Sequence, residues 1–171
     1  MTVSCVLDCS AKEAARQMVR PELLDHVAWP VMRFVPDPPH PSSWTPGEYP
    51  VRCVAFRVVP LGRPVIVIEV PESDQPGVHI LRDNGRGLSG ILRGVSRWDH
   101  SFTVRPHESD PHRARYSDDV VIEAGRLTPV VWLFASCFYR WRQYRWRRLA
   151  RVAFAPLTRA DGLIDENDRP A

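Results

Sequence analysis

The stretch that most constrains the fold of this chain is residues 128–154, TPVVWLFASCFYRWRQYRWRRLARVAF. Thr128 fits the N-cap of a helix and Pro129 its first turn, and the helix should end before Pro156, since a residue before proline avoids the α region. Between these signals lie about 26 residues, which span about 39 Å at the helical rise. A helix of this length in a chain of 171 residues needs a large surface to pack against.

The predicted helix is apolar along one side. At the α-helical period, that face holds Val131, Phe134, Ala135, Phe138, Leu149 and Val152. The opposite face holds Ser136, Arg140, Gln143, Arg147 and Arg151. Arg142 and Arg145 fall within the apolar face. A helix with polar groups set into its apolar side can close a cavity as well as a core.

Length and charge place the chain in a broad class. A length of 171 residues fits a single domain, residues 1–171, in which the acidic residues 160–171 are expected to be a flexible tail. The net charge is only +3, although the predicted helix is strongly basic. Charges interrupt every long apolar run and the first residues show no secretory apolar segment, so we expect a cytoplasmic protein.

The rest of the chain reads as one strand, two short helices and then a run of strands joined by turns. Ser10 and Glu13 form a capping box for the first helix, and Pro21 opens the second. A proline-rich loop covers residues 36–46, and the sequence DNGRG at residues 83–87 is typical of a hairpin turn. The predicted strands are residues 2–8, 31–35, 49–59, 64–70, 77–82, 88–104 (bent at Gly94) and 115–123. Consecutive strands of this kind form an antiparallel sheet, which predicts an α+β fold with the long helix on the concave face.

Three motifs carry a resemblance to a known family. They are W-x-H at Trp98–His100, Y-x-D-x-V-x-I at Tyr116–Ile122, and the helix that follows Gly125 and runs through FYRWRQYRWRRL. With the order of elements, they resemble the START/Bet v 1-like (SRPBCC, helix-grip) superfamily, nearest its polyketide cyclase-like bacterial members. The resemblance implies a curved antiparallel sheet of about seven strands around the helix, enclosing a cavity for lipids, sterols or polyketides. Members include carriers, sensors and enzymes, so the fold alone leaves the function open.

Alternation along two strands predicts which side chains face inward. They are Trp98, His100, Phe102 and Val104 on one strand and Tyr116, Asp118, Val120 and Ile122 on the next. With a hairpin centred near Ser109, His100 lies opposite Asp118, and Phe102 opposite Tyr116.

An inward histidine and aspartate at this distance should form a hydrogen bond. The pairing keeps Asp118 ionised and raises the pKa of His100, unless burial outweighs the carboxylate. One interpretation is a polar anchor or a general acid/base inside an apolar cavity. The other is a buried structural pair that holds the sheet together.

Arg142 and Arg145 also allow two interpretations. A buried guanidinium needs an acceptor, so either arginine is a candidate clamp for a ligand carboxylate or phosphate. Alternatively, each forms an internal ion pair with an acid of the sheet, or its aliphatic side chain extends along the apolar surface so that the guanidinium reaches solvent.

The basic aromatic run from Arg140 to Arg151 has three possible uses: nucleic-acid binding, contact with a membrane surface, or a solvated helix back. No nucleic-acid motif accompanies it, and we expect no nucleic-acid partner and no stable membrane insertion. His107 and His112 lie near two acids in a polar loop without zinc spacing, and the four cysteines form no C-x-x-C pair. We therefore expect no metal. The sequence contains no phosphate-binding loop and no dinucleotide-binding motif, so we also expect no cofactor.

These observations favour a protein that binds a small hydrophobic molecule between sheet and helix without necessarily transforming it. The predicted ligand-binding residues are Trp98, His100, Phe102, Tyr116, Asp118, Val120, Phe134, Phe138 and Arg142. One alternative is a cyclase/dehydratase-type enzyme in which His100, Asp118 and Tyr116 move protons. Another is a regulatory or interaction module that uses the arginine-rich helix.

Overall fold

The computed structural model describes residues 1–37, 39 and 41–157, so the tail expected at residues 160–171 lies outside the described residues. The strands are β1 (Thr2–Leu7), β2 (Met32–Pro36), β3 (Gly47–Ala55), β4 (Val59–Gly62), β5 (Pro64–Glu69), β6 (His79–Asp83), β7 (Arg86–Gly87), β8 (Arg97–His107) and β9 (Asp110–Glu123). The helices are α1 (Ala11–Met18), α2 (Pro21–Ala28) and α3 (Thr128–Arg151), with short 3₁₀ turns η1 (Ile91–Gly94) and η2 (Gly125–Leu127).

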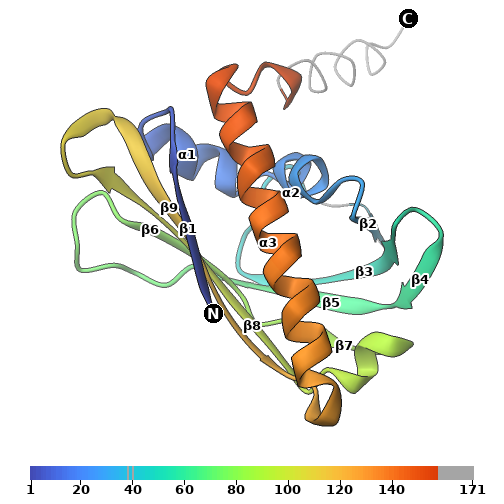
Figure 1. Ribbon diagram of the computed structural model, residues 1–171. Helices are drawn as coiled ribbons and strands as arrows, with labels where there is room; N and C mark the ends of the chain where they lie inside the picture. The colour runs from blue at the N-terminus through green and yellow to red at the C-terminus, as the bar shows by residue number, and fades with distance from the viewer. Residues whose placement is uncertain (38, 40, 158–171) are drawn as a thin grey trace, which may run out of the picture.

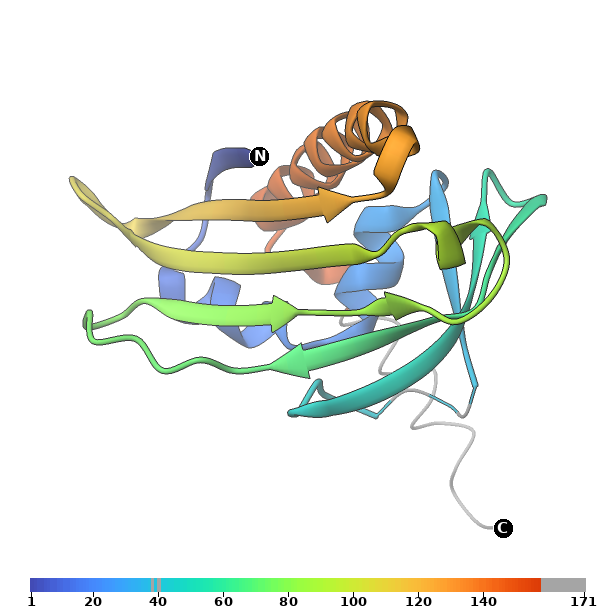
Figure 2. The same cartoon turned by 90° about the horizontal axis from the view of Figure 1, so that it is seen from below.

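All the described strands belong to one curved antiparallel sheet. Its order is β1-β9-β8-β6-β5-β3-β2, with β4 paired to β3 and β7 paired to β5. The three α-helices lie on the same side of this sheet, and α3 runs across its concave face (Figures 1 and 2). The predicted α+β helix-grip architecture is confirmed.

Local signals set the first elements as the sequence predicts. The Oγ of Ser10 accepts a hydrogen bond from the Glu13 N–H at 3.3 Å, which caps α1. Pro21 occupies the first turn of α2, where its missing N–H costs nothing. Strand β1 pairs with β9, so the first and last strands in the sequence lie side by side in the sheet.

Two turns differ from the prediction. The strand expected at residues 49–59 ends at Ala55, because Phe56 and Arg57 adopt positive φ and the chain turns back as β4. Residues 83–87 form no hairpin, because β6 and β7 both pair with the same neighbour, β5. A Cβ on Gly85 would lie 2.5 Å from the Val65 carbonyl oxygen, so this glycine allows a close backbone approach rather than a tight turn.

The β8–β9 hairpin is longer than predicted. Strand β8 begins at Arg97, after η1, instead of at residue 88, and the loop expected at residues 105–113 is mostly strand. A bulge at Pro106/His107 displaces the register by two residues, so His100 lies opposite Val120 and Phe102 opposite Asp118. The predicted register is wrong, but a shift of two keeps every side chain on its predicted face.

The start of α3 differs from the prediction. Thr128 is the first helical residue rather than the N-cap. Its Oγ1 accepts a hydrogen bond from the Ala124 N–H at 2.9 Å and donates one to the Gly125 oxygen at 2.8 Å. Its hydroxyl therefore holds the η2 turn from which the helix starts.

The buried face of α3 is wider than the apolar stripe predicts, because β1 and α2 cover its flanks. Ser136 and Gln143, predicted to face solvent, are buried, whereas Val152 is exposed. The Nε2 of Gln143 donates to the Val3 oxygen of β1 at 2.7 Å, which accounts for its burial. Tyr139 and Trp146 also belong to the buried face.

The core fills the space between α3 and the sheet. Its largest fully buried side chains include Trp146 and Tyr116, whose rings are 4.2 Å apart, and Leu149 beside them. Burying side chains of this size stabilises the fold by about 1.5–3 kcal/mol each.

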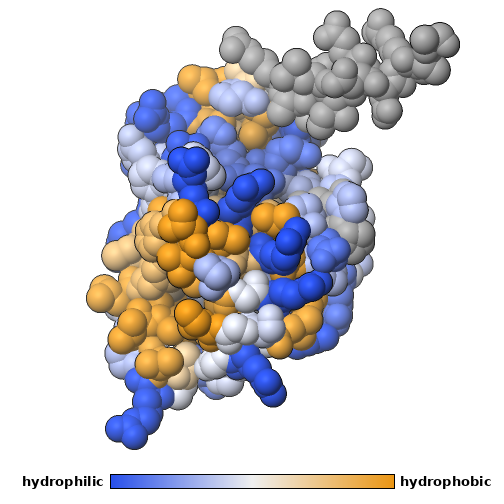
Figure 3. Space-filling view, turned by 90° about the vertical axis from the view of Figure 1, so that its right-hand side faces the viewer, coloured by the Kyte–Doolittle hydropathy of each residue, from blue (hydrophilic) through white to orange (hydrophobic). Residues whose placement is uncertain are grey.

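Figure 3 shows exposed apolar side chains gathered on the face that carries the start of α3 and the β3–β4 turn. Exposed residues on these elements are Phe56, Val58, Leu127, Val130 and Leu133. None of the described helices is long and apolar enough to cross a membrane.

Candidate functional site

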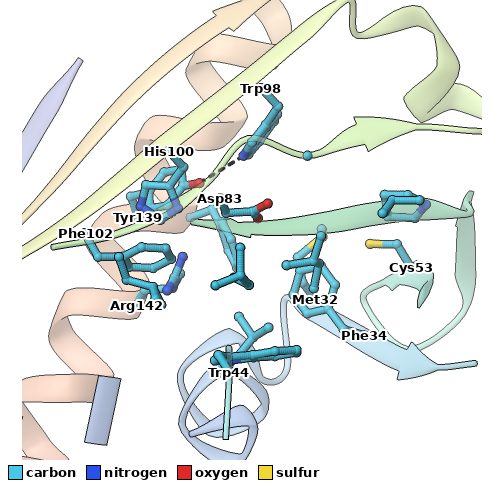
Figure 4. A pocket seen from close by; sticks show the side chains of 18 of the residues that line it. Met32, Phe34, Trp44, Cys53, Asp83, Trp98, His100, Phe102, Tyr139 and Arg142 are labelled. Carbon is cyan, nitrogen blue, oxygen red and sulfur yellow. Dashed lines mark hydrogen bonds between the residues drawn. The ribbon is translucent and has the colours of Figure 1, made fainter. Parts of the chain in front are cut away.

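A cavity of about 120 Å³ lies between the concave face of the sheet, α3, and the two short helices (Figure 4). Its wall is mainly apolar and aromatic, with side chains from every layer of the fold. Met32 and Phe34 come from β2, Leu81 from β6, and Trp44 from the segment before β3. The sheet's curvature produces this space, because its strands bend away from the straight helix.

Five of the nine predicted ligand-binding residues line this cavity: Trp98, His100, Phe102, Phe138 and Arg142. The other four are absent from its described wall. Tyr116, Asp118 and Val120 are buried under α3 on the β9 side, and Phe134 is stacked on Phe138 with ring centres 6.0 Å apart. The residues on β9 face inward, but the helix covers them.

Asp118 is the centre of a buried hydrogen-bond network behind the cavity wall. Its Oδ1 accepts from His100 Nε2 at 2.8 Å and from the Tyr116 hydroxyl, and its Oδ2 accepts from Gln143 Nε2 at 2.8 Å. The His100–Asp118 contact is therefore diagonal, between residues two positions apart in register, rather than directly opposite as predicted. The three donors come from three different elements: His100 from β8, Tyr116 from β9 and Gln143 from α3.

The charges in this network follow from burial and hydrogen bonding. Burial lowers the pKa of His100 and outweighs the opposing effect of Asp118. Burial alone would raise the pKa of Asp118, but the hydrogen bonds from His100 and Tyr116 and the charge of Arg142 lower it. Burial therefore acts against the imidazolium that the pairing with Asp118 favours, and a neutral ring with its proton on Nε2 keeps the hydrogen bond to the carboxylate.

Arg142 is 5% exposed and lines the cavity. Its guanidinium carbon lies 5.1 Å from the centre of the Phe102 ring, 5.3 Å from Tyr139 and 5.8 Å from Phe138. Its Nε is buried without a hydrogen-bond partner, and within the described chain no carboxylate oxygen lies within 4.0 Å of the guanidinium. Neither form of the structural interpretation applies to Arg142: its guanidinium has no ion pair within the described chain, and its side chain does not reach solvent.

Arg145 is in a different position. Its Nη2 lies 3.1 Å from both the Nε2 and the carbonyl oxygen of His26, and its side chain is absent from the described cavity wall. It joins α3 to α2, which is a structural contact.

Two polar residues of the wall were missed by the sequence analysis. The Tyr139 hydroxyl accepts a hydrogen bond from Trp98 Nε1 at 3.2 Å (Figure 4). Asp83 accepts one from the Val67 N–H at 3.0 Å, and burial raises its pKa to about 7. Asp83 was hidden by the apparent turn sequence, yet its spacing of two from the buried Leu81 marks it as inward-facing.

Among the described residues, no group of three or more His, Cys, Asp or Glu side chains is arranged to hold a metal ion. His107 lies at the tip of the β8–β9 hairpin, where its Nδ1 accepts from the Ser109 N–H at 3.4 Å.

Comparisons with known proteins show the fold alone. No family model matches the chain, and no curated protein matches it. Solved structures similar to it include a hypothetical protein of Helicobacter pylori (TM-score 0.61, 9% identity, 87% of this chain and 86% of that one), a protein of Chromobacterium violaceum (0.59, 14%, 88% and 95%), and a START superfamily protein of Mycobacterium smegmatis (0.53, 9%, 90% and 97%). The chain has the START/Bet v 1-like helix-grip fold.

Proposed function

We propose that this chain binds a small hydrophobic molecule, lipid-, sterol- or polyketide-like, in the cavity between sheet and α3. The observation that carries the proposal is the cavity wall itself, which is apolar and aromatic with a few convergent polar groups. The ligand-binding role of the START-like fold supports it. In this proposal the sheet and the three helices act as one ligand-binding domain.

The cavity volume limits how much of the ligand is enclosed. Pockets for drug-sized ligands measure roughly 300–1,000 Å³. A dry apolar cavity of roughly 150 Å³ holds one benzene molecule, so the 120 Å³ here accommodates one ring or the end of a chain. A longer ligand requires rearrangement of flexible wall residues such as Met18 and Met32.

We propose binding rather than turnover, because the cyclase/dehydratase alternative needs its proton-transfer residues at the cavity surface. Of His100, Asp118 and Tyr116, only His100 lines the cavity. Its Nε2 is directed at Asp118, and both partners are fully buried. This geometry suits a rigid wall better than a proton relay to a ligand.

The arginine-rich back of α3 gives less support for an interaction module. Arg147 and Arg148 are exposed, but Arg151 lies 3.3 Å from Asp8 and Arg140 donates to the Ser136 oxygen of its own helix. We expect no nucleic-acid partner. The expected cytoplasmic location belongs to this proposal, in line with the four free cysteines.

Native mass spectrometry of the purified chain, followed by titration with the apolar dye 1-anilinonaphthalene-8-sulfonate and with 3-phenylpropanol, tests the proposal. The test variant is Leu81→Phe, which fills the cavity from β6, and the matched control is Val121→Phe on the exposed face of β9. We expect the alcohol to bind the wild type and the control, and to bind Leu81→Phe at least several-fold more weakly. Equal binding to both variants, with both folded, would show that the ligand lies elsewhere.

A further inference from the structure

The environment of Arg142 identifies the polar end of the ligand. A guanidinium has five N–H donors in one plane and no acceptor. The three aromatic rings around Arg142 attract its charge but do not accept its in-plane N–H bonds as an oxygen would. A buried charge with unmet donors is costly, and it is tolerated where the donors have a use.

The acids nearest to Arg142 are already engaged. Asp118, on β9, uses Oδ1 for His100 and Tyr116 and Oδ2 for Gln143. Asp83, on β6, accepts from the Val67 N–H with Oδ1. Asp118 stabilises the guanidinium charge through space, as Asp83 does when it is ionised, yet in the described structure neither lies within ion-pair distance of it.

The guanidinium is also placed where a ligand would meet it. Arg142 lies beside Phe102 at one side of the space that the wall side chains surround (Figure 4). On the other side the wall is apolar, with Met32, Phe34 and Trp44. Other polar groups of this wall include Asp83, His100, Tyr139 and the Trp146 Nε1–H. The permanent cation in its buried part is Arg142, so an anionic end of a ligand is best placed there.

We infer that the ligand is a carboxylic acid whose carboxylate pairs with Arg142 while its short apolar or aromatic body fills the cavity. A carboxylate matches the planar donor pair of a guanidinium. The small cavity has no other strong cationic donor in its buried part, which disfavours a phosphate with its larger charge; Arg86, at the edge, is exposed and paired with Glu48 at 3.1 Å. This inference rests on the proposed function and specifies the ligand's chemical class.

The test compares 3-phenylpropionate with 3-phenylpropanol, which share a skeleton and differ in the anionic group. Affinities are measured by isothermal titration calorimetry near neutral pH. The proteins are the wild type, Arg142→Met, Arg142→Lys and the control Arg140→Met, which removes an exposed arginine of the same helix. Circular dichroism melting checks that each variant is folded.

We expect the wild type to bind the acid about 10- to 100-fold more tightly than the alcohol, the range for a charge-assisted pair. Arg142→Met should lose this preference and keep its affinity for the alcohol within about threefold. Arg142→Lys should keep part of the preference, because lysine retains the charge without the planar fork. Arg140→Met should match the wild type.

If Arg142→Met does not fold, the Arg142 Nε–H signal in NMR spectra of the wild type gives the same answer. It should move when the acid is added and stay in place with the alcohol. Equal affinities of the wild type for both compounds, or a preference that survives in folded Arg142→Met, would overturn the inference and leave the proposed function standing. Failure of both compounds to bind the wild type would overturn both.

Discussion

Asp118 on β9 and Arg142 on α3 are both charged and both buried, yet their surroundings are opposite. Asp118 is 0% exposed and accepts three hydrogen bonds. Arg142 is 5% exposed, its Nε has no hydrogen-bond partner, and the centres of three aromatic rings lie 5.1, 5.3 and 5.8 Å from its guanidinium carbon. Two successive residues of α3 therefore have different surroundings. Gln143 donates a hydrogen bond to Asp118, whereas Arg142 lines the cavity.

The contrast separates structural polar groups from ligand-binding ones. A satisfied buried carboxylate fixes the relative positions of β8, β9 and α3, so its loss should affect stability. A buried guanidinium without acceptors contributes little to stability, so its loss should affect binding.

Removal of the Asp118 side chain should have the largest effect on stability. Asp118→Ala leaves the donors of His100 and Tyr116 buried without an acceptor and leaves Gln143 Nε2 with the Val3 oxygen alone, so we expect a loss of about 3–5 kcal/mol in the free energy of unfolding. Urea denaturation measures it. Asp119→Ala, on the exposed face of the same strand, is the control and should lose less than about 1 kcal/mol. If Asp118→Ala also lost less than about 1 kcal/mol, the Asp118 network would not be a structural support.

Stability should also depend on pH through Asp83. Its pKa is raised by burial from 3.8 to about 7, so the unfolded chain releases this proton above about pH 4 and the folded chain holds it to about pH 7. Asp83 therefore stabilises the fold at low pH, and this contribution is lost as pH rises from about 4 through 7. Relative to Asp83→Asn, the wild type should lose about 2–4 kcal/mol over that window.

Urea denaturation of both proteins at a series of pH values measures this difference. His100 acts in the opposite direction, because its lowered pKa makes the folded state lose stability as pH falls below about 6.5. His100 is present in both proteins, so its effect cancels in the comparison. A difference that does not change between pH 4 and 7 would show that Asp83 is ionised in the folded chain.

Phe138→Ala should have a smaller effect than a typical core truncation. Such a change costs roughly 3–5 kcal/mol in a well-packed core. Phe138 is buried but borders a cavity, so its ring has fewer packing partners and we expect about 2 kcal/mol. Thermal and urea unfolding measure the loss, and a value near 5 kcal/mol would show that the cavity is closed at this ring.

Arg142→Met should have the smallest effect on stability. Methionine fills a similar volume without a charge, so the free energy of unfolding should stay within about 1 kcal/mol of the wild type or rise. The measurement is urea denaturation beside Arg145→Met, which removes the contact with His26 and should destabilise more. A large loss for Arg142→Met would mean that Arg142 is structural.

Periodicity predicted the fold, and five of the nine predicted binding residues line the cavity. The alternation along β8 and β9 placed Trp98, His100 and Phe102 on the inner face, and the long helix predicted what covers them. Alternation cannot count residues in a bulge, so the register was wrong by two while the face stayed right. The helical pattern likewise missed Gln143 and Ser136, because Gln143 contacts Val3 of β1 and Ser136 contacts Met1, both distant in sequence.

The wall opposite the helix was harder to predict. Met32, Phe34 and Trp44 come from a short strand and a proline-rich segment whose placement depends on the curvature of the sheet. Asp83 lay in a sequence typical of turns, but its pairing with Ile68 of β5 and His100 of β8 shows that it belongs to a strand. Sequence patterns are local, whereas a cavity is made by elements far apart in the chain.

The central claim, that the cavity is the ligand site, is tested most directly by methyl NMR of the wild type during titration with 3-phenylpropanol. Met18, Met32 and Leu81 line the cavity, whereas Val130 and Leu133 lie on the exposed start of α3. We predict saturable shifts of the first three methyl signals and none of the other two. Shifts confined to Val130 and Leu133 would contradict the account, because they would place the ligand on the outer apolar face.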